Sequence, residues 1–417
     1  MNKESDLKVI WSNKNFCYLF IGKFLSSVGD QIYLIGLPLL ALKMTGSGLV
    51  LSLVVSCEYI AKLLASFGGG ALADRLNKKY IMILSALMQS LIVGFIYVLS
   101  NKDLLSSVTI CILAALVAAS GSFYSSAETA LLPTLFDKKH YTAMNSQFNL
   151  INTTCRLIGP VVAGGLIGVI GVQKIFLIDS LSFIILIILV GFISISHNKL
   201  SNSTKKESLF QSIKAGFVFL QQNNFLIKIA LGSFLTNIAL GPILSLLVYF
   251  AQSSLHASSL DIGIIYACGS IGGLTMGFLA PRLKKRFNNF STVFLINILL
   301  LGLGILLLGT SFNIIIACIA NFIIISMVYW YNVSYNTIVQ EFTPSNYMGR
   351  ISSVMFIVSQ ISLPLSISLA GILTNYLSIK LIYSVLGIFM VIIGLIFYTI
   401  VYKSIDAKIS AEKQVPI

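Results

Sequence analysis

Residues 69–80 read GGALADRLNKKY, and residues 276–287 read MGFLAPRLKKRF. Each stretch gathers charged residues between two apolar runs that are long enough to cross a lipid bilayer. A hydrocarbon core of roughly 30 Å takes about 20 helical residues. Both stretches are therefore interpreted as short charged hinges between membrane-spanning helices. Their near-repetition indicates that one structural unit occurs twice.

The rest of the chain has the composition of a polytopic membrane protein. Of its 417 residues, 57% are apolar and 10% are charged, whereas soluble domains carry about 25% charged residues. The apolar runs are continuous, which excludes the alternating strands of a β-barrel. We predict an all-α fold with twelve transmembrane helices, at residues 16–42, 47–73, 80–100, 105–131, 145–170, 174–196, 224–251, 260–281, 290–309, 313–338, 350–375 and 379–402.

The loop charges predict the orientation of these helices. With both termini in the cytoplasm, 21 Lys and Arg residues fall on the inner side and four on the outer side, namely Lys43, Lys102, Lys174 and Lys380. By the positive-inside rule, both termini are expected in the cytoplasm. The net charge of +14 is thus spread along one face of a bilayer, which argues against binding to nucleic acid.

A shift of 207 residues aligns the two halves of the chain without a gap at several distant points. Gly70 meets Gly277, Tyr124 meets Tyr331, Ser26 meets Ser233, Asp30 meets Asn237, and Ala163-Gly164 meets Ala370-Gly371. Two six-helix repeats of like orientation occur in transporters whose substrate site lies between the halves. We predict a pseudo-symmetric half at 1–196, a cytoplasmic linker with an amphipathic helix at 197–223, a second half at 224–402 and a cytoplasmic tail at 403–417.

The first hinge resembles the loop motif between helices 2 and 3 of the major facilitator superfamily. The matching residues are Gly70, Asp74, Arg75, Lys78 and Lys79. Asn77 replaces the second glycine of the motif, and because Asn tolerates a left-handed backbone, we expect the turn to be kept. In the family this loop latches the cytoplasmic side, and its Asp faces a helix N-terminus, which attracts anions. The second copy keeps Arg282 but has Pro281 in place of the Asp, so only the first copy can form the latch.

A second resemblance lies at residues 155–165, CRLIGPVVAGG, which look like the antiporter motif of drug–proton exchangers. Gly159, Pro160 and Gly164 match that motif. Such small residues let helix backbones approach closely, so plain helix packing is the alternative reading. Further stretches at 24–54 and 130–147 resemble the bacterial branch that contains macrolide efflux proteins and the enterobactin exporter. The resemblance covers essentially the whole chain and implies the major facilitator fold.

Ionisable residues within the predicted spans are candidates for function, because charge inside a bilayer is costly. Asp30, Glu58, Lys62 and Arg156 lie near mid-depth and form the predicted proton-coupling set. Asp30 is the first choice as proton carrier, because Lys62 lies one turn after Glu58 and is well placed to neutralise it. The alternative is a closed salt-bridge network that only orients helices.

Three other ionisable residues lie nearer the ends of predicted spans. Lys23 is expected to extend its ammonium group to the inner membrane face. Glu128 and Asp179 are expected to have interfacial roles. In the second half, polar and aromatic side chains form the predicted substrate surface, at Asn237, Trp330, Tyr331, Asn332, Tyr335 and Gln360. Packing in the core or against lipid is the alternative for each aromatic residue.

The sequence contains no Walker loop, no HExxH or GxSxG motif and no Cys/His cluster. We therefore expect neither an enzyme nor a metal or cofactor site. The prediction is a monomeric, proton-driven exporter of a small amphipathic drug-like molecule or secondary metabolite in a bacterial inner membrane, working by rocker-switch alternating access. The alternatives are a lysophospholipid flippase or other lipid carrier and a non-transporting receptor or immunity protein.

Overall fold

A computed structural model describes residues 3–194, 209–286, 290–344 and 348–399. All its regular elements are helical. They are α1 (Lys3–Ser12), α2 (Lys14–Thr45), α3 (Gly48–Arg75), α4 (Lys78–Asn101), α5 (Ser107–Leu131), η1 (Leu132–Thr134), η2 (Lys138–His140), α6 (Tyr141–Ile170), α7 (Lys174–Gly191), α8 (Leu209–Gln222), α9 (Asn224–Leu255), α10 (Ser259–Arg286), α11 (Phe290–Thr310), α12 (Ile314–Phe342), α13 (Met348–Leu373) and α14 (Ile379–Phe397). Twelve of these helices are long and apolar enough to span a membrane, which confirms the predicted number.

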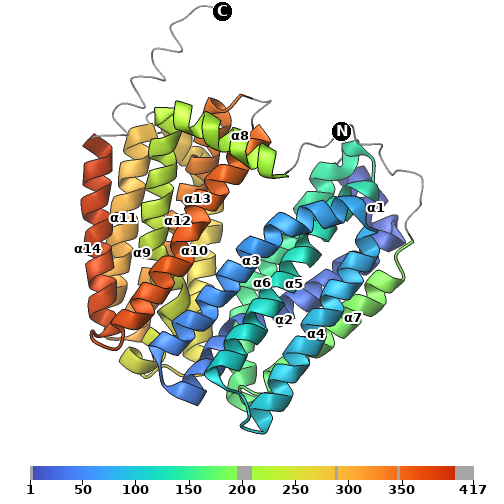
Figure 1. Ribbon diagram of the computed structural model, residues 1–417, viewed down its shortest axis with the longest axis horizontal. Coiled ribbons are helices and arrows are strands. Elements are labelled where there is room, and N and C mark those ends of the chain that lie inside the picture. Colours follow the sequence, from blue (N-terminus) through green and yellow to red (C-terminus); the bar gives the residue numbers. More distant parts are fainter. Residues whose placement is uncertain (1–2, 195–208, 287–289, 345–347, 400–417) are drawn as a thin grey trace, which may run out of the picture. The chain divides into compact units, whose positions relative to one another are not determined.

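The chain divides into two compact units. The first contains Met1–Asn202 together with Ala257–Ala267, and the second contains Ser203–His256 and Cys268–Ile417. In the first unit, α3 packs along α5, α2 packs against α6 and α7, and α4 packs against α5 and α7 (Figure 1). In the second unit, α9 packs against α13 and α14, while α11 packs against α12 and α14. The α8 helix lies against the start of α13. Because Gly216 of α8 has no side chain, the backbone of α8 can approach the carbonyl of Arg350 on α13.

Helix α4 shows how the membrane environment inverts the usual distribution of polar residues. Leu84 and Leu91, two turns apart on one face, are exposed, whereas Gln89 and Ser90 are buried. The Ser90 hydroxyl donates to the carbonyl oxygen of Ser180 on α7 at 3.0 Å. Hydrogen bonds between helices satisfy polar groups that lipid cannot, so the polar face of α4 points inward. The exposed leucines form the surface expected to contact lipid.

The hinge between α3 and α4 is built differently from the predicted turn. Asn77 has φ −65° and ψ 115°, and its side chain accepts a hydrogen bond from the Lys79 amide at the start of α4. The prediction of a left-handed conformation at this residue is therefore wrong. Asparagine serves here as a helix N-cap, which its short side-chain oxygen suits well. The side chains of residues 70–75, including Gly70, Asp74 and Arg75, lie outside the described residues.

The hinge also holds the end of the first six-helix bundle in place. The Lys79 ammonium donates to the carbonyl oxygens of Gly191 at 2.6 Å and Ile193 at 2.8 Å, at the C-terminus of α7. Asn15 of α2 bonds to both the amide and the carbonyl of Ser194, at 3.0 and 2.9 Å. A cation is favoured at a helix C-terminus, where carbonyl groups lack partners within the helix. The start of the segment that follows α7 is thereby fixed by two side chains of the first unit.

We expect Lys79→Ala to lower the stability of the first unit by about 1–2 kcal/mol, because two charge-assisted hydrogen bonds are lost. Thermal unfolding of the purified protein in detergent measures this effect. Lys78→Ala is the matched control, since no hydrogen bond from the Lys78 side chain to another described residue is seen. Equal melting temperatures for the two variants would show that Lys79 does not hold α7.

Candidate functional site

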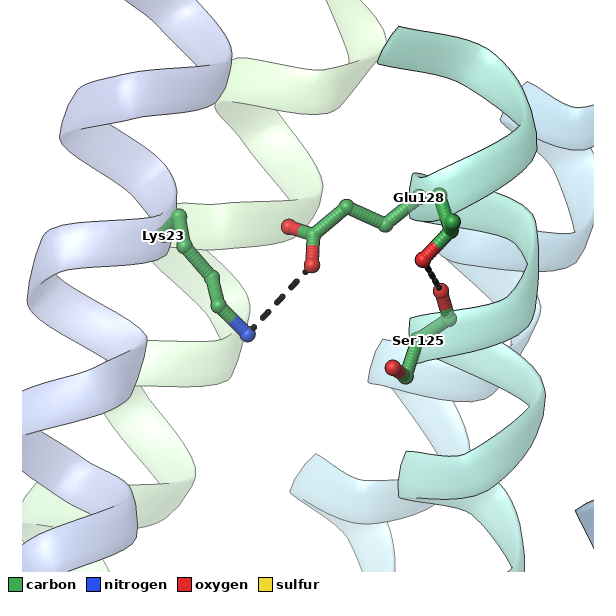
Figure 2. A network of polar contacts seen from close by, with 4 residues as sticks. Lys23, Ser125 and Glu128 are labelled. Atoms are coloured by element: carbon green, nitrogen blue, oxygen red, sulfur yellow. Dashed lines mark hydrogen bonds and ion pairs between the residues drawn. The ribbon is translucent and has the colours of Figure 1, made fainter. Parts of the chain in front are cut away.

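The centre of the candidate site is an ion pair between two membrane-spanning helices of the first unit. Lys23 Nζ on α2 lies 3.6 Å from Glu128 Oε2 on α5, and the two side chains are only 18% and 11% exposed (Figure 2). The ammonium group also lies 5.3 Å from the ring centroid of Tyr124, one helical turn before Glu128. The prediction that Lys23 reaches toward the membrane face is therefore wrong. Its charge is satisfied inside the bundle by a carboxylate and an aromatic face.

Asp30 lies two helical turns after Lys23, on the same face of α2. It is half-buried, and its carboxylate accepts no hydrogen bond from the residues that the structure describes. The charges of Lys23, Glu128 and Lys62 all act on it. Asp30 is thus a carboxylate beside an ion pair that is already complete, and it has spare capacity to bind a proton or a cation.

Asp179 on α7 lies against Gly29, the residue directly before Asp30 on α2, and interacts electrostatically with Asp30. Its side chain is 1% exposed, and its Oδ2 atom has no hydrogen-bond partner among the described residues. The other oxygen, Oδ1, lies 3.5 Å from the Ser182 hydroxyl. That oxygen also packs directly on Gly29, where a larger side chain would collide with it and with the Ser182 hydroxyl. Asp179 is buried between helices, so the expected interfacial role is wrong.

Glu58 on α3 accepts a hydrogen bond from the Tyr33 hydroxyl of α2 at 3.1 Å. Lys62, one turn later, acts on Glu58 electrostatically. It is nevertheless exposed, and no ion pair within 4.0 Å joins the two among the described residues. The direct partner of Glu58 is therefore a tyrosine that the spacing of charges along the sequence did not reveal.

The residues of the antiporter-like motif lie at tight helix contacts within the first unit. Gly159 of α6 packs on the side chain of Gln31 of α2, which leaves no room for a methyl group. Gly164 touches the Ser259 carbonyl at the start of α10, and the Pro160 carbonyl touches Gly263. The motif therefore does what small residues do in membranes, letting backbones approach.

Arg156 of α6 is exposed, one residue after the buried Cys155. In the second unit, Arg282 of α10 is also exposed, and its guanidinium donates to the Phe278 carbonyl at 3.0 Å. Where the chain is described, no group of three or more His, Cys, Asp or Glu side chains gathers as metal ligands.

The predicted substrate residues of the second unit lie in two settings. Asn237 of α9 donates from Nδ2 to the carbonyl and hydroxyl oxygens of Ser359 on α13, at 2.9 and 2.8 Å. Tyr331 and Tyr335 of α12 stack with ring centroids 6.1 Å apart. Trp330, the residue before Tyr331, is buried. Asn332 is exposed and Gln360 is half-buried. The structure thus joins Asn237 to α13 and the two tyrosines to each other.

Asp30 and Glu58, together with the residues around them, form what we call the charged cluster of the first unit. Five of its residues were not in the set predicted from the sequence, namely Lys23, Tyr33, Tyr124, Glu128 and Asp179. A signal was available for one of them, because Lys23 and Asp30 are seven residues apart and must share a helix face. For Glu128 and Asp179, position near a helix end hid their burial, since burial depends on the neighbouring helices.

Comparison with known proteins identifies the family. Residues 19–367 match the family model described as Major Facilitator Superfamily. The chain belongs to the major facilitator superfamily. It is accordingly a multi-pass membrane transporter and not an enzyme. The expected fold is confirmed at this level.

Known relatives are distant. The staphyloferrin A transporter of Staphylococcus aureus is 25% identical over 388 residues, covering 92% of this chain and 95% of the relative. Macrolide efflux protein A of Streptococcus pyogenes is 23% identical over 378 residues, covering 89% and 91%. A crystal structure of a bacterial homologue of the iron transporter ferroportin superposes with a TM-score of 0.70 at 16% identity, covering 93% of this chain and 97% of that one. At this identity the structural match shows the fold alone.

We expect Lys23→Met to lower the free energy of unfolding of this transporter by about 3 kcal/mol, because the substitution leaves the Glu128 carboxylate buried without a cation. Adding Glu128→Gln should restore most of the loss, since no buried charge then lacks a partner. Thermal unfolding of both variants in detergent tests this, with the exposed Lys102→Met as control. If the double variant is no more stable than the single one, the two side chains are not energetically coupled.

Proposed function

We propose that this transporter exports a small amphipathic molecule in exchange for protons. The observation that carries the proposal is the charged cluster of the first unit, where Asp30 lies beside the Lys23–Glu128 ion pair with no hydrogen bond of its own from the described residues. A carboxyl group in a membrane-spanning helix is costly to keep and marks ion pathways and proton relays.

The chemistry of coupling follows from this arrangement. When Asp30 is ionised it adds a negative charge beside Glu128, and when it is protonated that charge is removed. Alternating exposure of the site to the two sides of the membrane would let Asp30 take up a proton on one side and release it on the other. Glu58, Lys62 and Arg156 are proposed to tune or share this role.

Export of an amphipathic substrate is supported by the names of the relatives. One of them is called a macrolide efflux protein and another the staphyloferrin A transporter. In the second unit, the stacked pair Tyr331 and Tyr335 and the amide of Asn237 offer apolar faces and hydrogen-bonding groups suited to such a molecule. We propose a monomer in the bacterial cytoplasmic membrane with both termini in the cytoplasm, since the loop charges favour that side.

We expect Asp30→Asn to abolish pH-gradient-driven uptake in inverted membrane vesicles, because an amide cannot carry a proton. The probe is a labelled macrolide, chosen by a susceptibility screen of the wild type in a pump-deficient host. Asp103→Asn, at an exposed turn where φ is 52°, is the matched control and should transport normally. Full gradient-driven uptake by Asp30→Asn would remove Asp30 from the coupling mechanism.

Asp74 is proposed as the cytoplasmic latch of the hinge motif. We expect Asp74→Ala to slow transport several-fold while leaving the equilibrium affinity for the same macrolide nearly unchanged, because a latch controls conformational exchange and not binding. Transport rates in vesicles and binding to purified protein separate these effects. Asp137→Ala removes an exposed carboxylate elsewhere in the first unit and serves as the control. A large loss of affinity in Asp74→Ala would place Asp74 at the substrate site and contradict the latch.

A further inference from the structure

We propose that Asp179 and Asp30 form a two-carboxyl site in the first unit, in which Asp179 holds a proton whose binding depends on Asp30. The use of this site in transport rests on the proposed proton coupling. Its existence rests on the packing around Asp179.

The Asp179 side chain is isolated from water and from good hydrogen-bond donors. It is 1% exposed, and Oδ2 meets no donor among the described residues. The Ser182 hydroxyl lies 2.7 Å from the backbone oxygen of Asp179 but 3.5 Å from Oδ1, so its hydrogen is directed to the backbone. An ionised carboxylate sealed from water without a cation or good donors costs several kcal/mol. Such groups avoid the cost by binding a proton.

No positively charged side chain among the described residues is shown to act on the Asp179 carboxyl group. From α2, the side chains that interact electrostatically with Asp179 are Asp30 and Tyr33, and neither supplies a positive charge. The other helices packed against α7 are α4 and α6. Their ionisable side chains are Lys78, Lys79, Tyr80 and Tyr97 on α4 and Tyr141, Cys155 and Arg156 on α6. The side chains shown to act on Asp179 within the described residues are Asp30, Tyr33 and Ser182, and none of these is a cation.

Asp179 is in direct contact with α2. Oδ1 of Asp179 packs on Gly29, the residue directly before Asp30, and the same glycine accommodates Ser182. This close approach brings a second carboxyl group near Asp30, which already interacts electrostatically with Glu128. Glu128 and Asp30 thus both act on the ammonium group of Lys23, whereas the Asp179 carboxyl group acts on Asp30. Two neighbouring carboxyl groups of this kind titrate as a pair, because ionising one disfavours ionising the other.

Infrared difference spectroscopy of the full-length protein in lipid nanodiscs tests the site, with pH as the probe and no substrate present. We expect the wild type to show the carbonyl band of a protonated carboxyl group at neutral pH. Asp179→Asn should lose this band completely, whereas Asp30→Asn should keep it with a shifted frequency or titration midpoint. Asp103→Asn should match the wild type.

A band that survives in Asp179→Asn overturns the proposal, and so does a band that Asp30→Asn leaves unmoved. If Asp179→Asn does not fold, the Asp30→Asn protein is prepared with isotope-labelled aspartate. The isotope must then shift the frequency of the remaining carbonyl band. An unshifted band belongs to another residue type and refutes the assignment. Failure of the proposed function is recognised separately, by wild-type macrolide transport in vesicles that ignores the pH gradient. That result would leave the infrared assignment of Asp179 standing.

Discussion

A charge held among membrane-spanning helices needs a partner, and the Lys23–Glu128 ion pair meets this constraint for the first unit. Lys23 comes from α2 and Glu128 from α5, so the pair ties together two helices that are far apart in the chain. Tyr124 covers the ammonium group. Once these groups have satisfied one another, any further carboxyl group nearby is in excess. Asp30 and Asp179 are such groups, and the proposed proton on Asp179 removes one of the two excess negative charges.

At the equivalent positions of the second unit, neutral side chains replace the acidic and basic ones. At the offset of 207 residues, the first-unit residues Lys23, Asp30, Glu128 and Asp179 correspond to Ala230, Asn237, Tyr335 and Leu386. Asn237 is neutral, and its amide nitrogen donates two hydrogen bonds to Ser359, whereas the Asp30 carboxylate accepts none from the described residues. A neutral, satisfied network keeps helices in register without responding to pH. Within one repeat pattern, the two units therefore differ in chemistry at equivalent positions.

The fold could be predicted from the sequence because each membrane-spanning helix is recognised by its average apolar composition, not by any single residue. A bilayer requires about 20 apolar residues per helix, and each span carries that signal over its whole length. Helix α1, at Lys3–Ser12, escaped because ten residues of mixed polarity carry no such signal. The conformation of Asn77 was mistaken because the motif's glycine implied a left-handed turn, whereas the side chain of Asn offers an N-cap instead. The burial of Glu128 and Asp179 depends on the approach of other helices, notably at Gly29, which no local pattern records.

The two hinges show how far repetition of sequence implies repetition of structure. Helix α3 ends at Arg75, and the equivalent residue of the second copy is Arg282, yet α10 continues to Arg286. Asn77 begins a new helix as an N-cap, while its counterpart Lys284 is still inside α10. The local conformations differ although the basic residues recur. What the two copies share is therefore positive charge at one end of a helix, and that is the property that fixes the side of the membrane on which a loop stays.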